Sequence, residues 1–152
     1  MGNGMLRALH CLLYFAAAFP LGVHAAGTIK IGLVAEITGQ AAEAGMYTVN
    51  GARLAIEDIN KAGGVLGVPV ELHVEDSQGS NPGAVLAFSK LFSRGDIPAI
   101  VGPIRSTQIQ AASPSIARAG IPVMIGGTDP SLTRVNNRWY SAAGPMICIR
   151  PR

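Results

Sequence analysis

The sequence predicts an α/β protein built on a doubly wound parallel sheet, with helices on both faces. Two observations carry this prediction. Apolar runs of strand length alternate with stretches of helical periodicity, in the order βαβαβαβ. The connections between them are short, which is typical of parallel strands joined by right-handed crossover helices.

The first two elements show the pattern most clearly. A strand is predicted over Thr28–Ile37, where apolar residues first alternate and then follow one another. A helix is predicted over Tyr47–Ala62, because apolar residues recur there at steps of three and four. These residues are Val49, Ala52, Ile56 and Ile59. Gly63-Gly64 ends the helix, because glycine readily adopts the left-handed cap.

The later elements repeat this order. Strict alternation predicts the second strand over Val68–Asp76. Asn81-Pro82 supplies a capping residue and a first helical proline, so a helix is predicted from there to Arg94. The remaining predictions are a third strand over Ile97–Val101, a third helix over Ser106–Ala119 and a fourth strand over Ile121–Ile125.

Candidate functional residues lie where the predicted strands end, since ligands of such sheets bind beyond the carboxyl ends of the strands. The loops there are 38–45, 77–80, 102–107 and 126–129. Ser106 and Thr107 follow the third strand at a helix start, which attracts anions. The alternative is that Ser106 only caps its own helix. Asp76 is expected to organise the turn that follows it.

Several function classes are excluded by what these loops contain. The loop after the first strand is not GxGxxG, and no GxxxxGK[ST] occurs, so dinucleotide and P-loop sites are unsupported. No histidine lies near Ser106, which argues against a nucleophile. We therefore expect no enzyme and no cofactor.

Charge and cysteine content exclude two further classes of partner. From Ala26 to Tyr140 there are nine Lys or Arg and nine Asp or Glu residues, which gives no basic surface for nucleic acid. The same part of the chain has no cysteine, and Cys148 alone cannot build a thiolate metal site. We expect no metal.

The first 25 residues read as a secretory signal peptide. Arg7 precedes an apolar run over Ala8–Gly22, which is short for a membrane span. Val23 and Ala25 are small or aliphatic residues at the −3 and −1 positions, so cleavage is expected after Ala25; the less favoured alternative is a membrane anchor that is retained. The mature chain would lie in the periplasm.

A set of short motifs recurs in a fixed order, and it resembles a known family. The motifs are Ile29-Lys30-Ile31-Gly32, Thr38-Gly39, Asn50-Gly51-Ala52, Ala55-Ile56-Glu57-Asp58-Ile59-Asn60, Ala62-Gly63-Gly64, Glu75-Asp76, Asn81-Pro82, Val101-Gly102-Pro103 and Gly126-Gly127-Thr128. Over residues 27–140 the chain resembles solute-binding proteins of bacterial ABC importers with the type I periplasmic-binding fold, typified by the leucine/isoleucine/valine-binding proteins.

The resemblance implies a Rossmann-like N-terminal lobe that binds an amino acid of the branched-chain type, or a related small amide or carboxylate. Ser106 and Thr107 would donate to the ligand's carboxylate. The ammonium group would meet the carbonyl of Gly126 in the Gly126-Gly127-Thr128 loop, with the hydroxyl and N–H of Thr128 beside it. Gln40 to Ala44 would line the side-chain pocket. An ABC permease in the membrane is the implied partner.

The chain departs from the family in two places. Arg105 is a departure in this loop; we predict that it faces solvent, and the alternative is that it adds positive charge toward an acidic ligand. Residues 141–152 also match nothing in the family, whose members usually continue with F-R-x-R-P-N-D and a second lobe. One base restored after Tyr140 permits such a reading, and Met146-Ile147 then gives Asp in any codons.

A single-base loss is therefore our hypothesis for the atypical tail. The alternative is a short protein with its own C-terminal strand. With the second lobe missing, we expect weak or absent ligand binding and exposed strands. Two other functions stay open: a ligand-sensing extracellular domain of a receptor on the same fold, and, less favoured, an enzyme.

Overall fold

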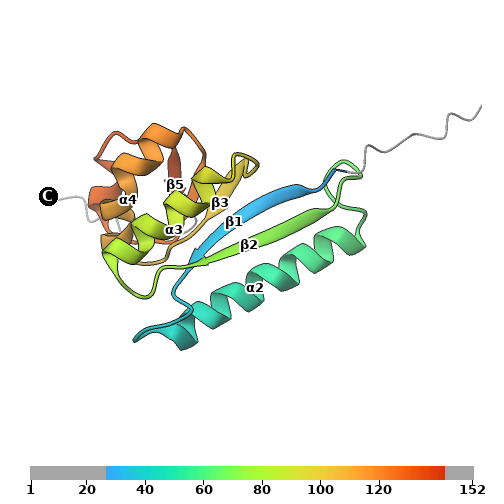
Figure 1. Ribbon diagram of the computed structural model, residues 1–152, viewed down its shortest axis with the longest axis horizontal. Helices are drawn as coiled ribbons and strands as arrows, with labels where there is room; N and C mark the ends of the chain where they lie inside the picture. Colours follow the sequence, from blue (N-terminus) through green and yellow to red (C-terminus); the bar gives the residue numbers. More distant parts are fainter. Residues whose placement is uncertain (1–26, 143–152) are drawn as a thin grey trace, which may run out of the picture.

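The computed structural model describes residues 27–142, which form a parallel sheet of five strands with helices on both faces (Figure 1). The strands are β1 (Ile29–Ala35), β2 (Val70–Asp76), β3 (Ala99–Val101), β4 (Val123–Ile125) and β5 (Tyr140–Ala142). The helices are α2 (Ala42–Lys61), α3 (Asn81–Ser93), α4 (Ser106–Ala119) and the short 3-10 helix η1 (Pro130–Thr133). The predicted fold class is confirmed.

The strand order is β2-β1-β3-β4-β5, and every neighbouring pair is parallel. The chain leaves β1 toward β2 on one side and later returns to place β3 on the other side. The strand order thus reverses beside β1, and the loops after β1 and β3 diverge there. In open α/β sheets this switch point is where ligands bind.

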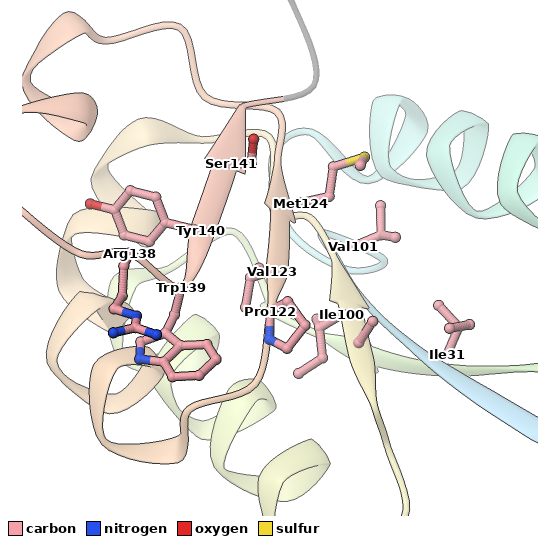
Figure 2. Close-up of a pocket in the computed structure, with 11 residues that line it drawn as sticks. Ile31, Ile100, Val101, Pro122, Val123, Met124, Arg138, Trp139, Tyr140 and Ser141 are labelled. Atoms are coloured by element: carbon pink, nitrogen blue, oxygen red, sulfur yellow. The ribbon is translucent and has the colours of Figure 1, made fainter.

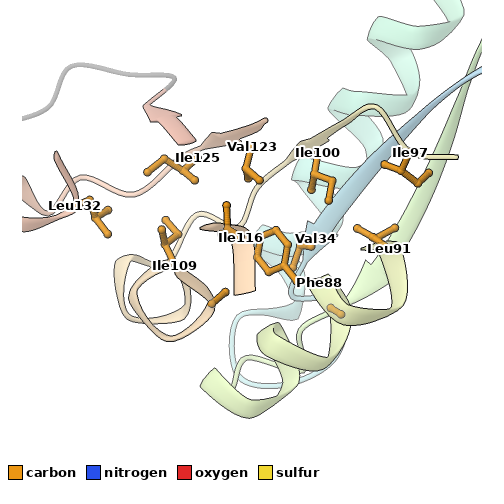
Figure 3. Close-up of a cluster of buried hydrophobic side chains, with 12 residues drawn as sticks. Val34, Phe88, Leu91, Ile97, Ile100, Ile109, Ile116, Val123, Ile125 and Leu132 are labelled. Carbon is orange, nitrogen blue, oxygen red and sulfur yellow. The ribbon is translucent and has the colours of Figure 1, made fainter. Parts of the chain in front are cut away.

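The two faces carry cores of different size. α2 lies along β1 and β2 on one face, where Leu33, Ala35 and Val49 are buried together. α3 and α4 lie on the other face, where buried side chains from both helices meet β1, β3 and β4 (Figure 3). That larger core includes Val34, Phe88, Leu91, Ile97, Ile100, Ile109, Ile116, Val123, Ile125 and Leu132.

Three strands begin later than predicted, for one physical reason. β2, β3 and β4 each start at the residue after a proline, namely Pro69, Pro98 and Pro122. Proline has no backbone N–H to donate to a strand ladder, so regular pairing begins behind it.

Helix α2 begins at Ala42, five residues before the predicted start at Tyr47. Gly45 is typical of a helix breaker, but it lies buried inside the first turns of α2. A Cβ at this position would lie 1.7 Å from the Glu36 carbonyl oxygen. Glycine therefore permits the close approach of α2 to the end of β1, which single-residue propensity does not reveal.

The short helix η1 was not predicted, and a C-terminal strand was predicted only as the alternative to the single-base loss. η1 and β5 follow the fourth strand, and β5 pairs with β4 through Tyr140, Ser141 and Ala142. Two residues of the atypical tail thus belong to the sheet. The rest of the tail and the predicted signal peptide lie outside the described residues. None of the helices in residues 27–142 has the length and apolar character needed to span a bilayer.

Candidate functional site

Four loops meet at the carboxyl edge of the sheet, because parallel strands end at the same edge. They comprise residues 36–41 after β1, 77–80 after β2, 102–105 after β3 and 126–129 after β4. All predicted site residues lie in these loops or in the first turn of the helix that follows.

Ser106 is the first residue of α4, and its hydroxyl faces the neighbouring loop. The capping position is occupied by Arg105, which makes no side-chain cap. The alternative that Ser106 caps its own helix is therefore wrong. The Asp129 N–H donates instead to Ser106 Oγ, at 3.2 Å. Since this oxygen accepts from the β4–η1 loop, its own hydrogen is directed elsewhere and remains available for donation.

The β4–η1 loop is pressed against the start of α4. Gly127 is buried, and a Cβ there would lie 2.6 Å from Ile109 Cδ1 and 3.0 Å from Ser106 Oγ. The neighbouring Gly126 N–H donates to the Pro103 carbonyl at 3.1 Å. A side chain at position 127 would require the Ile109 and Leu132 side chains to shift, so glycine permits the close approach of this loop to Ser106.

Asp129 fixes the far end of the same loop. Its carboxylate accepts from Ser131 N–H at 2.8 Å and from Gln110 Nε2 at 3.4 Å. The backbone hydrogen bond from Ser131, followed by the Ser131 side chain, lowers the pKa of Asp129 below its usual value. The ionised acid holds the turn in which its own N–H points at Ser106.

The structure thus brings one group of predicted residues together. Ser106 and Gly127 lie in near contact, and Thr107, Gly126 and Thr128 are exposed beside them. Gln40 and Ala44 are also exposed, but they lie on the β1 side of the switch point. Ala44 belongs to the first turns of α2 and not to a loop as predicted.

Arg105 is exposed, as predicted, but its guanidinium also pairs with Glu36, which was not predicted. Its Nε donates to Glu36 Oε2 at 2.7 Å, and its Nη2 to Glu36 Oε1 at 3.4 Å. The Arg105 side chain is 41% exposed, whereas that of Glu36 is 5% exposed. A role for Glu36 at this edge was not predicted. A charged residue directly after the apolar run of residues 32–35 was the available signal.

Asp76 organises the turn after β2, as predicted, and also the loop after β1. Its Oδ1 accepts from Gln78 N–H at 2.8 Å and from Ile37 N–H at 2.9 Å. Its Oδ2 accepts from Thr38 Oγ1 at 2.5 Å. Partial burial raises the pKa of Asp76, but the hydrogen bonds, led by that from Thr38, outweigh burial and lower it overall.

Two hollows in the described part of the chain differ in size, and the smaller one lies at this edge. The hollow at the switch point, lined by Glu36, Arg105 and Gln108 among others, has a volume of about 10 Å³. A larger hollow of about 280 Å³ lies on the opposite side of the sheet from α4 (Figure 2). Its lining is mostly apolar residues of β3 and β4, and Arg138, Trp139, Tyr140 and Ser141 complete it.

Comparison with known proteins gives one consistent result. A family model described as periplasmic binding protein matches residues 28–147. The Leu/Ile/Val-binding protein BraC3 of Rhizobium johnstonii is 36% identical over 130 residues, which are 85% of this chain and 35% of the relative. The leucine-, isoleucine-, valine-, threonine- and alanine-binding protein of Pseudomonas aeruginosa is 36% identical over 72% of this chain and 29% of its own length.

A solved structure agrees with these relatives. The branched-chain amino acid transporter substrate binding protein LivJ from Streptococcus pneumoniae, in complex with isoleucine, superposes with a TM-score of 0.72 at 31% identity. The match covers 76% of this chain and 33% of LivJ. The chain therefore spans about a third of the length of the proteins it matches. All three are described as binding proteins, in agreement with the expectation of no enzyme.

Proposed function

The chain belongs to the periplasmic binding protein family, and we propose that it forms the N-terminal ligand-binding lobe of the substrate-binding component of an ABC importer. The ligand is an amino acid of the branched-chain type, or a related small amide or carboxylate. The contact between Ser106 and the β4–η1 loop carries the proposal, because it places hydroxyl and backbone groups of both elements at one point of the carboxyl edge.

The start of α4 supplies the groups for the ligand's carboxylate. Backbone N–H groups in the first turn of a helix have no carbonyl partner one turn earlier, and they point along the axis toward the edge. Thr107 adds an exposed hydroxyl, and Ser106 adds the hydrogen that its contact with Asp129 leaves available. Hydrogen bonds of this kind to an ionised acceptor are stronger than neutral ones.

The β4–η1 loop supplies acceptors for the ammonium group. Gly126 and Thr128 are exposed next to the start of α4, so the Gly126 carbonyl and the Thr128 hydroxyl are within the same small area. Gly127 permits this close approach, since a Cβ there would lie 2.6 Å from Ile109 Cδ1. Gln40 and Ala44, across the switch point, would bound the ligand's side chain.

The edge is open in this lobe. The hollow at the switch point, about 10 Å³, has room for about one water at most, far less than an amino acid needs. A ligand would lie on the edge with most of its surface in water, and tight binding would need a second lobe to close over it. With that lobe, and after removal of residues 1–25 in the periplasm, the protein would deliver its ligand to an ABC permease.

Titration of the isotope-labelled chain with L-leucine, followed by NMR, tests the site. We expect the amide resonances of Ser106, Thr107 and Thr128 to shift. The Kd should be about 1 mM or weaker, which corresponds to a binding free energy of ~4 kcal/mol at most. Ser106→Ala should weaken the effect, whereas Ser89→Ala, a matched change at an exposed position of α3, should not. Leucine methyl ester, which lacks the carboxylate, should produce no shift at Ser106.

Two results would contradict the proposal in different ways. A micromolar Kd for the chain alone would contradict the requirement for a second lobe. Shifts confined to residues away from α4 and the β4–η1 loop would contradict the site. The proposed single-base loss is tested separately by sequencing the gene beyond the codon for Tyr140, where a reading frame for a second lobe should continue.

A further inference from the structure

We propose that Glu36 is the positioning residue of the carboxyl edge: one buried carboxylate that holds the loops after β1, β2 and β3 as a unit and keeps Arg105 away from the ligand. The inference deepens the proposed function, on which it rests for the meaning of this edge. The claim that Glu36 holds the three loops together concerns the chain without ligand. Glu36 is 6% exposed although it lies in a loop, directly after β1.

Two of the three loops are joined to Glu36 by hydrogen bonds. The Ala41 N–H, just before α2, donates to Oε1 at 2.8 Å. Arg105 Nε, just before α4, donates to Oε2 at 2.7 Å, across 69 residues of sequence. The starts of the two helices on opposite faces of the sheet are therefore fixed relative to each other by a single side chain.

The third loop closes over the same carboxylate. Gly79 follows β2 with a φ of 65°, and a Cβ there would lie 2.3 Å from Glu36 Oε1. Gly39, with a φ of 107°, is similarly close, since its Cβ would lie 3.2 Å from the same oxygen. Both positions therefore favour glycine for two reasons: the positive φ, and the short distance that a Cβ would have to Glu36 Oε1.

Burial makes this arrangement cooperative. A carboxylate removed from water is stable only while its charge is paired and its oxygens accept hydrogen bonds. Loss of Arg105 would thus leave the Glu36 carboxylate without its charge partner and change its position. The loops at Ala41 and Gly79 would then shift as well, although Arg105 does not itself bond to them. Cooperation of this kind distinguishes a positioning residue from a surface ion pair.

The same pairing affects which ligands the edge accepts. Arg105 lies immediately before Ser106, and its side chain is 41% exposed. While Glu36 holds the guanidinium, the edge offers hydroxyl and backbone donors with no unpaired positive charge. Without Glu36, the guanidinium would be attracted to any anion at the start of α4, and anions without an ammonium group would bind there more readily.

The first experiment compares Glu36→Gln with Lys30→Gln by NMR of the full chain without ligand. Lys30 pairs with Asp96 at 2.6 Å in a more exposed ion pair, and Lys30→Gln is the matched control. We expect Glu36→Gln to shift the amides of Ala41, Gly79 and Arg105 together. Hydrogen exchange at Ala41 should become about tenfold faster, as expected for the loss of one hydrogen bond to a charged group. Lys30→Gln should leave these amides unchanged.

The second experiment uses Arg105→Gln, which keeps the inference testable if Glu36→Gln does not fold. We expect this variant to shift the amides of Ala41 and Gly79, although neither residue bonds Arg105. Shifts confined to α4 would overturn the inference, as would a Glu36→Gln pattern equal to that of Lys30→Gln. Sulfate should shift the Arg105 side-chain resonance in Glu36→Gln and not in the parent chain. Because no amino acid is used, these outcomes are independent of leucine binding.

Discussion

The half of the sheet built from β1 and β2 is covered on both faces, whereas the half built from β3, β4 and β5 is covered on one. The difference is visible along a single row of side chains on the face that carries α2. Leu33, Val101 and Met124 are neighbours in register, and their exposure rises from 0% to 38% to 52% across the row. Figure 2 shows Val101 and Met124 on adjacent strands.

The opposite face shows no such gradient. Ile100 and Val123, also in register, are 1% and 2% exposed beneath α3 and α4. Yet β3 reads Ala-Ile-Val and β4 reads Val-Met-Ile, which is apolar on both faces. Parallel strands of this composition are normally buried on both sides. The sequences of β3 and β4 are therefore typical of strands buried on both faces. Among the described residues, helices cover these strands on one face only.

The largest expected effect comes from two neighbouring residues of β4 on opposite faces. Ile125→Ala should lower the free energy of unfolding by about 2–5 kcal/mol, because it leaves a cavity in the larger core. Met124→Ala should change it by no more than about 0.5 kcal/mol, as at other exposed positions. Denaturant unfolding of both variants measures the difference. Similar losses for both would show that the α2-side face of β4 is covered in solution.

A second comparison concerns how α2 is attached to the covered half. Asn60 of α2 donates to the Val70 carbonyl and accepts from the Val70 N–H, both at 2.8 Å. Asn60→Ala should therefore lower stability by about 1–2 kcal/mol. Asn50→Ala, at an exposed position of the same helix, has the same change in helix propensity without these bonds. Equal effects of the two substitutions in thermal unfolding would contradict a role of Asn60 in attaching α2.

A third prediction addresses the exposed row itself. The double variant Val101→Thr with Met124→Thr should change stability by less than about 1 kcal/mol. It should reduce self-association at high concentration and the binding of an apolar fluorescent dye, because both depend on exposed apolar surface. Sedimentation and dye titration measure these effects. Unchanged self-association of the variant would show that another surface mediates it.

The smallest effect is expected from pH, through Asp76 in the covered half. Its pKa is lower in the folded chain than the ordinary value near 3.8. The ionised form therefore adds stability above that value, and the contribution is lost as the pH falls through the folded-state pKa. The stability difference between the chain and Asp76→Asn should be constant at neutral pH and shrink in acid. Thr38→Val should move the Asp76 pKa back toward its ordinary value, as NMR titration can measure.

Local signals in the sequence predicted most of the fold. The bounds of α4 agree with prediction, because Ser106 opens the helix and Gly120 adopts the left-handed cap with a φ of 65°. Helix α2 was predicted short, because the fit of Gly45 against Glu36 is a tertiary contact. β3 and β4 lie in apolar runs, whereas β5 reads Tyr-Ser-Ala and η1 is four residues long, so neither β5 nor η1 shows a pattern that sequence analysis can detect.

The sequence predicts those candidate site residues that a single loop positions. It does not predict the side-chain pairs that form between different loops. Ser106 and the glycines at positions 126 and 127 follow directly from strand ends and a helix start. The pairing of Glu36 with Arg105 joins residues 69 positions apart, and no local pattern connects them. The partner of Ser106 is likewise set by a loop 23 residues away. Specific side-chain pairs across the switch point arise from packing, which the individual motifs do not encode.

Trp139 gives the exposed half an optical reporter of its own. It is the single tryptophan of the chain, and it lies in the wall of the hollow beside Pro122 and Tyr140. Arg138 rests over its ring at 5.2 Å. The wavelength of its emission and its quenching by acrylamide therefore follow this region of the sheet, with no label attached. A blue shift of the Trp139 emission with reduced quenching would show that the hollow has become buried.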